Sequence, residues 1–105
     1  MSRHYEFIRK ATGRPVSLET VEKDMVAILD PDYTIDKDRY HPVWDTFILW
    51  AFGRLMKHGG CQLEPHMWSF IAQEMADAQE DSMNAVRVRA MVLYLQATYH
   101  FNAWG

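Results

Sequence analysis

Cysteine is almost absent from this sequence, in which Cys61 is the only one among 105 residues. A lone cysteine cannot form a disulfide within the chain, so the sequence excludes the disulfide framework that holds many small secreted domains together. The N-terminal residues also lack the charged-then-apolar pattern of a secretion signal. We therefore expect a protein of the reducing cytoplasm.

The chain has no excess of positive charge: 11 basic residues stand against 14 acidic ones, and the formal net charge is −3. The chain therefore has no large positive field, and direct binding to nucleic acid is not expected. Acidic residues are concentrated, with seven acids and three bases in residues 17–40 and five acids and no base in residues 61–81. This segregation is typical of solvated helix faces. It leaves open one alternative, an acidic decoy that inhibits a nucleic-acid-binding protein and is encoded by a mobile element.

No apolar run is long enough to cross a membrane. The longest block, Val43 to Met56, is shorter than the roughly 20 residues that a bilayer requires, and Asp45 and Arg54 interrupt it. Hydrophobic residues make up 49% of the chain and charged residues 24%, which is the balance of a folded globular protein. We expect a single domain over residues 1–105.

Patterns that support catalysis are missing. There is no glycine-rich phosphate loop, and Cys61 lacks the flanking residues of an activated nucleophile. The alternating acids from Asp30 to Asp38 imitate the start of a calcium loop, but Ile35 replaces its glycine and His41 replaces its bidentate acid. The sequence therefore favours a non-enzymatic protein with no cofactor.

A weak metal motif lies around the Gly-Gly pair at residues 59–60. His58, Cys61 and His66 offer nitrogen and sulfur ligands within nine residues. A structural zinc site usually has four ligands, so His41, His100 or a distant acid would have to supply the fourth. The alternative is that His58 simply interacts with the negative end of a helix dipole, next to an ordinary thiol.

What the sequence does contain is a helix that is apolar on nearly every side. Six apolar residues follow one another from Phe47 to Phe52. At about 100° per residue their side chains point all round the axis, which predicts a buried central helix over the Val43–Met56 block. Gly53 and Thr46 share one side of it and predict a close contact with another helix. Because 105 residues offer little material to enclose such a helix, we expect a second copy or a partner to cover part of it.

Helical signals recur along the rest of the chain. Ser17 is a good N-cap for a helix that ends before Pro31, and Pro65 opens a helix that runs to about residue 79. Asp81 or Ser82 caps a last helix over residues 83–99. Residues 2–11 are predicted to form a short helix or arm, residues 33–40 a polar connection, and the aromatic tail at 100–104 is expected to dock. The predicted fold is all-α: a small compact bundle of about four main helices.

These observations predict a small helical protein–protein interaction module or regulator, which acts as a homodimer and binds a further, unidentified protein. Aromatic side chains dominate buried contacts, so they are the expected core or interface anchors. The anchors are Trp44, Phe47, Trp50, Phe52, Trp68, Phe101 and Trp104. A second hypothesis is a helical pocket for a small molecule or metal.

Overall fold

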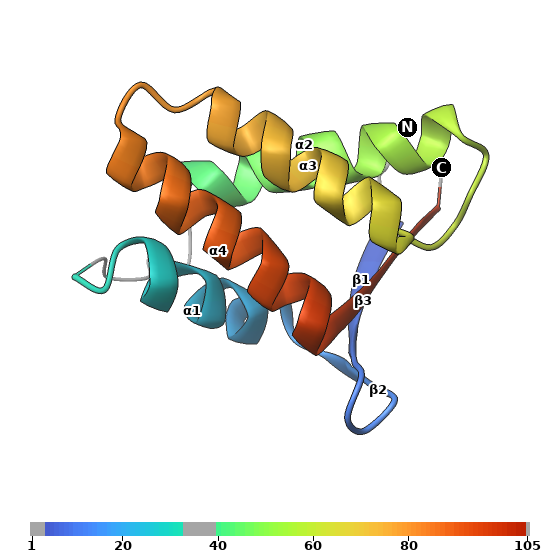
Figure 1. The fold of residues 1–105 in the computed structure, drawn as a ribbon. Coiled ribbons are helices and arrows are strands. Elements are labelled where there is room, and N and C mark those ends of the chain that lie inside the picture. The colour runs from blue at the N-terminus through green and yellow to red at the C-terminus, as the bar shows by residue number, and fades with distance from the viewer. Residues whose placement is uncertain (1–3, 33–39, 105) are drawn as a thin grey trace.

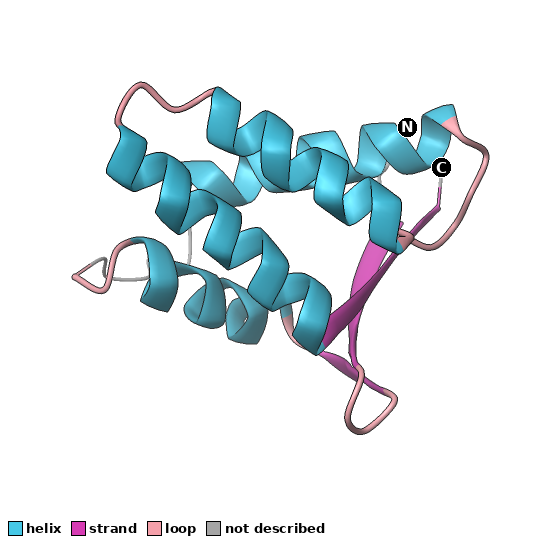
Figure 2. Ribbon diagram, in the orientation of Figure 1, coloured by secondary structure: helices cyan, strands magenta, loops and turns pink. Residues whose placement is uncertain are grey.

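The computed structural model describes residues 4–32 and 40–104, and it shows that the all-α prediction is wrong. Four helices pack on one face of a three-stranded antiparallel sheet within these ranges, so the fold is mixed α and β (Figures 1 and 2). Nearly all of the connection predicted at 33–40 lies outside the described residues, as do two of the four acids of the calcium-like segment.

The sheet is built from both ends of the chain. β1 (His4–Arg9) is its central strand, and it pairs with β2 (Arg14–Val16) on one side and with β3 (Tyr99–Trp104) on the other. β1 and β3 pair along their whole length. The helix or arm predicted at residues 2–11 is therefore wrong where it can be checked, because residues 4–9 are a strand.

A tight turn joins β1 to β2. The N–H of Gly13 donates to the carbonyl of Arg9 at 2.8 Å, and Gly13 has a φ of +69°. This left-handed backbone suits glycine, which has no Cβ to clash. Gly13 therefore turns the chain from β1 into β2.

The docked tail was predicted, but its conformation was not. Tyr99, Phe101 and Ala103 are completely buried against the helices, and the residues between them are only partly buried. This alternation is the signature of a strand with one covered face. The partner strand begins more than ninety residues earlier, so no local pattern could have revealed the pairing.

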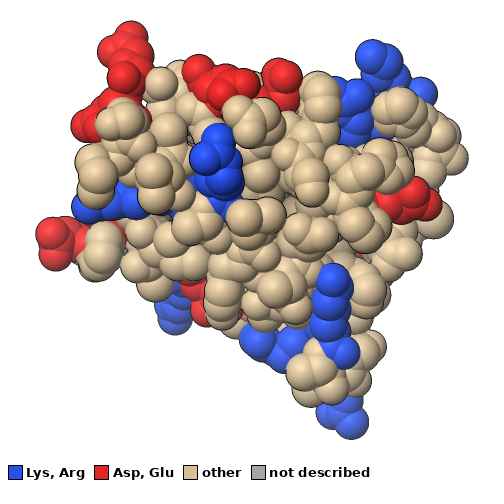
Figure 3. Space-filling view, in the orientation of Figure 1, with Lys and Arg blue, Asp and Glu red and all other residues tan. Residues whose placement is uncertain are grey.

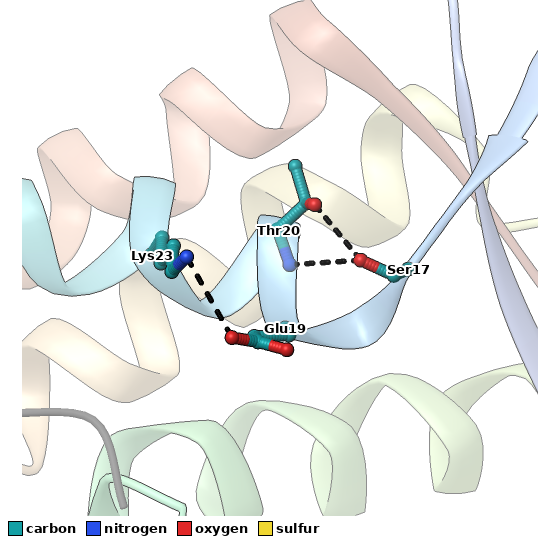
Figure 4. A network of polar contacts seen from close by, with 4 residues as sticks. All are labelled: Ser17, Glu19, Thr20 and Lys23. Atoms are coloured by element: carbon teal, nitrogen blue, oxygen red, sulfur yellow. Dashed lines mark hydrogen bonds and ion pairs between the residues drawn. The ribbon is translucent and has the colours of Figure 1, made fainter. Parts of the chain in front are cut away.

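The first helix confirms the predicted cap. α1 spans Leu18–Leu29, and the side chain of Ser17 accepts a hydrogen bond from the N–H of Thr20 at 3.2 Å. Ser17 and Thr20 also share a hydrogen bond between their hydroxyls, and Lys23 lies 3.6 Å from Glu19 one turn along (Figure 4). The ion pair is exposed and adds little, whereas the cap contributes about 1 kcal/mol to helix stability.

The remaining helices begin close to the predicted residues. α2 spans Pro42–Lys57 and α3 spans Pro65–Asp77, each with its proline in the first turn, where a missing N–H costs nothing. α4 spans Ser82–Thr98, and the carboxylate of Asp81 accepts the N–H of Met83. In Figure 1, α4 crosses the front of the molecule between α1 and α3, and α2 lies behind α3.

An aromatic cluster joins the two layers. The ring of Phe7, on β1, lies 5.1–6.3 Å from the rings of Trp44, Phe47, Tyr99 and Phe101. Phe7 is completely buried, and Trp44 and Phe47, which face it from α2, are also buried. Because these rings come from β1, α2 and β3, the cluster forms only when both ends of the chain meet the central helix.

Candidate interaction surfaces

The seven predicted aromatic anchors divide into three groups by exposure. The buried ones are Trp44, Phe47, Trp68 and Phe101. Trp50 and Phe52 are half-buried on α2 and pack against the edge of the core. Trp104 is 44% exposed at the end of β3. The first group therefore belongs to the core, and only the other two groups can contact a partner directly.

The outer side of α2 carries four exposed residues spaced four apart, here called the α2 ridge: Asp45, Leu49, Gly53 and Lys57. Leu49 is 51% exposed, so the predicted central helix is not fully enclosed by its own chain. A Cβ placed on Gly53 would have no neighbour within 4 Å among residues 4–32 and 40–104, apart from its own helix. The close helix contact predicted at Gly53 and Thr46 is thus not made by the described residues of this chain.

A hollow lies on each side of the α2 ridge. The first, between α2 and α3, has a volume of about 270 Å³ and includes Trp50, Arg54 and Phe70 in its lining. The guanidinium of Arg54 lies 3.5 Å from the centre of the Phe70 ring, which is 44% exposed. The second, of about 410 Å³, is lined in part by Tyr40 and Ile48. Both hollows are largely apolar and open to an incoming side chain.

The outer face of α4 carries a second set of exposed apolar residues, here called the α4 stripe. Its members are Met83, Val86, Ala90, Leu93 and Ala97. In the sequence, Val86, Ala90, Leu93 and Ala97 belong to one wide apolar face of the last helix, which did not show that they are exposed. The signal that could have found this surface is the regular spacing of three and four residues, which is typical of a helix that packs against another helix.

The three weak metal candidates do not converge. His58 follows α2, and its ring nitrogen lies 3.4 Å from Nη1 of Arg54. Cys61 is exposed, and its carbonyl accepts the N–H of Ala103, so this segment extends the edge of the sheet beside β3. His66 is exposed near Glu64. Among residues 4–32 and 40–104, no group of three histidine, cysteine, aspartate or glutamate side chains could hold a metal ion.

The acids of α1 are not all available to a partner. Glu22 is completely buried, and its carboxylate accepts the N–H of His41 at 3.0 Å, which ties α1 to the start of α2. Asp24 accepts a hydrogen bond from the hydroxyl of Tyr99. Two of the acids that an acidic decoy would present are therefore engaged within the fold.

Tyr99 links β3 to α1 through this hydrogen bond. Burial, the hydrogen bond to Asp24 and the negative charge of Asp24 raise the pKa of Tyr99 from 10.0 to about 12, while Arg9 opposes the rise. A raised pKa in the folded state favours folding below pH 10, and this contribution is lost as the pH rises from 10 to 12. The shift corresponds to about 2–3 kcal/mol.

Replacing Tyr99 by phenylalanine is expected to remove this pH dependence. Between pH 10 and 12 the free energy of unfolding should fall in both proteins, but by about 2–3 kcal/mol less in Tyr99→Phe than in the unaltered protein. At pH 8 the variant should be less stable by about 1–2 kcal/mol, because the hydrogen bond to Asp24 is lost. Urea unfolding at a series of pH values measures both effects. Parallel stability curves for the two proteins above pH 10 would contradict the assignment.

Comparisons of the chain with protein families, with curated proteins and with solved structures give no match. None of the helices in the described part of the chain has both the length and the hydropathy that a bilayer crossing requires.

Proposed function

We propose that this protein is a cytoplasmic protein-interaction module without catalytic activity, and that two copies pair through the α2 ridge. The observation that carries the proposal is the order of the ridge residues. Asp45 stands at one end, Lys57 at the other, and Leu49 and Gly53 lie between them, all exposed. A surface with this order is complementary to itself.

A two-fold axis near residue 51 would place two α2 ridges side by side in opposite directions. Asp45 of each copy would then face Lys57 of the other, and Leu49 would lie over Gly53, where no side chain blocks the space. Ridges of residues spaced four apart pack in this way when helices cross at about −50°. The same patch serves both copies, as a closed two-fold interface requires.

The apolar contact would provide the affinity and the charges would provide the register. Exposed ion pairs contribute up to about 1 kcal/mol each, so the two Asp45–Lys57 pairs alone cannot hold a dimer. A stable interface also buries about 1,000 Å² or more in total, which one helix ridge does not offer. The contact would therefore extend over the hollow between α2 and α3, where Phe70 is exposed.

Replacing Leu49 by lysine is expected to convert the dimer into a monomer. The dissociation constant should rise at least a hundredfold, since an unpaired charge would be placed at the centre of the contact. Sedimentation equilibrium and light scattering measure this effect. The matched control is Leu93→Lys, which changes a similarly exposed leucine on α4 and should leave the dimer intact. A stable monomer of the unaltered protein across micromolar concentrations would refute the proposed pairing.

Two further variants test the geometry of the same contact. Gly53→Leu should fold normally, because its Cβ points into open space, yet it should not dimerise. Asp45→Lys and Lys57→Asp should each weaken the dimer, and the two changes combined should restore it. Failure of the double variant to recover would contradict the two-fold axis at residue 51, even if Leu49→Lys dissociates the dimer.

A further inference from the structure

α4 has two apolar faces, and the described part of the chain covers only one of them. Val88, Met91, Val92 and Leu95 are buried and hold α4 against the core. On the opposite side the α4 stripe is exposed, with Met83 at 59%, Val86 at 58% and Leu93 at 44%. A space-filling view of this side shows mostly uncharged surface over α4 (Figure 3).

The spacing of the α4 stripe matches one kind of partner. Its members recur at intervals of three, four, three and four residues from Met83 to Ala97. This is the heptad pattern whose two apolar positions form the seam of a coiled coil. The side chains of Ala90 and Ala97 are small, so the axis of a second helix can come close. An exposed seam of this kind fits a helix better than it fits an irregular loop.

The charges beside the stripe indicate which helix would fit. Arg87 and Arg89 occupy the two flanking heptad positions, which set partner choice in coiled coils. Arg89 donates to the side chain of Gln73 on α3, and Arg87 forms no ion pair among the described residues. No acid occurs between residues 82 and 98. The flanks of the seam are therefore basic without compensation from α4 itself.

A second copy of this chain fits the α4 stripe poorly. A two-fold axis through the middle of the stripe would pass near Ala90 and bring Arg87 and Arg89 of both copies together within about one turn. Like charges at such positions destabilise the pair. The α2 ridge, with charges of both signs, has no such conflict. Two exposed apolar surfaces on one molecule thus differ in the partner that their charges favour.

We propose that the α4 stripe docks an amphipathic helix of another protein, with apolar residues at heptad spacing and acidic residues at the flanking positions. This inference does not depend on the homodimer, because it uses a different helix face. Apolar contacts along the stripe would supply the affinity. Arg87 and Arg89 would select acidic over basic partners and speed the encounter.

Two designed peptides of three heptads each provide the test. Both carry isoleucine and leucine at the seam positions, and they differ only in having glutamate or lysine at the flanking positions. Fluorescence anisotropy with the full chain should show that the glutamate peptide binds at least tenfold more tightly than the lysine peptide. Raising the salt concentration should reduce this difference. Equal binding of both peptides, or no binding of either at millimolar concentration, would overturn the proposal.

Variants on the two surfaces separate this proposal from the homodimer. Leu93→Lys should abolish binding of the glutamate peptide, whereas Leu49→Lys should leave it unchanged. Arg87→Glu should weaken binding of the glutamate peptide and strengthen binding of the lysine peptide. If Leu93→Lys dissociates a dimer, a second copy occupies the stripe and the proposal is wrong. It is also wrong if vesicles of phosphatidylglycerol and phosphatidylcholine bind through Leu93 while the glutamate peptide does not.

Discussion

A Phe7→Ala variant is expected to lose about 3–5 kcal/mol of its free energy of unfolding, which is most of the stability of a small domain. Phe7 is completely buried, and its ring contacts aromatic rings from α2 and β3. Alanine would leave a cavity at the point where the two layers meet, and the surrounding rings cannot collapse into it without leaving their own contacts. Urea unfolding followed by near-ultraviolet circular dichroism measures the loss.

The neighbouring residue provides the control. Ile8 follows Phe7 on β1, lies on the opposite face of the sheet and is only partly buried. Ile8→Ala should therefore cost much less than Phe7→Ala, although both changes shorten a side chain in the same strand. A similar loss from the two substitutions would show that the aromatic cluster does not hold the two layers together.

Ending the chain at Thr98 is expected to abolish folding. This truncation removes β3, which pairs with β1 along its whole length and buries Tyr99, Phe101 and Ala103. Without β3, only the short β2 would remain to pair with β1, and two-stranded sheets are marginally stable in water. Far-ultraviolet circular dichroism and proton–nitrogen correlation spectra should show a largely unfolded chain.

A shorter truncation tests whether the loss of folding comes from removal of the strand itself or merely from the shorter chain. A chain that ends at Ala103 lacks the exposed Trp104 but keeps the three buried residues of β3. It should fold with a loss of no more than about 1 kcal/mol. A folded chain ending at Thr98 would contradict the view that β3 is essential to the sheet.

The helices could be predicted because their signals are local. Ser17, Pro42 and Pro65 mark helix starts through capping and backbone geometry that involve only residues within one turn. The strands could not be predicted in this way. β1 and β3 each have few residues and depend on pairing across nearly the whole chain, so short-range periodicity does not distinguish them from a helix or a tail.

The candidate surfaces could be predicted only in part from the sequence. The excess of apolar residues on α2 indicated that one chain would not cover them all, and Leu49 is indeed exposed. The seven aromatic residues were predicted to be core or interface anchors, and only the structure shows that four of them lie in the core. The exposed aliphatic residues of α4 were assigned to one broad apolar face, which the structure divides into a buried and an exposed stripe.

The sequence by itself determined where α1 to α4 begin, the absence of a disulfide within the chain and the order of charges along α2 and α4, because these follow from neighbouring residues. The tertiary structure alone decided that the chain ends form a sheet and which apolar side chains stay exposed. The physical reason is that burial depends on the whole set of packed neighbours. Leu49 is apolar in any fold, but the packing of the other elements determines that its side chain faces outward.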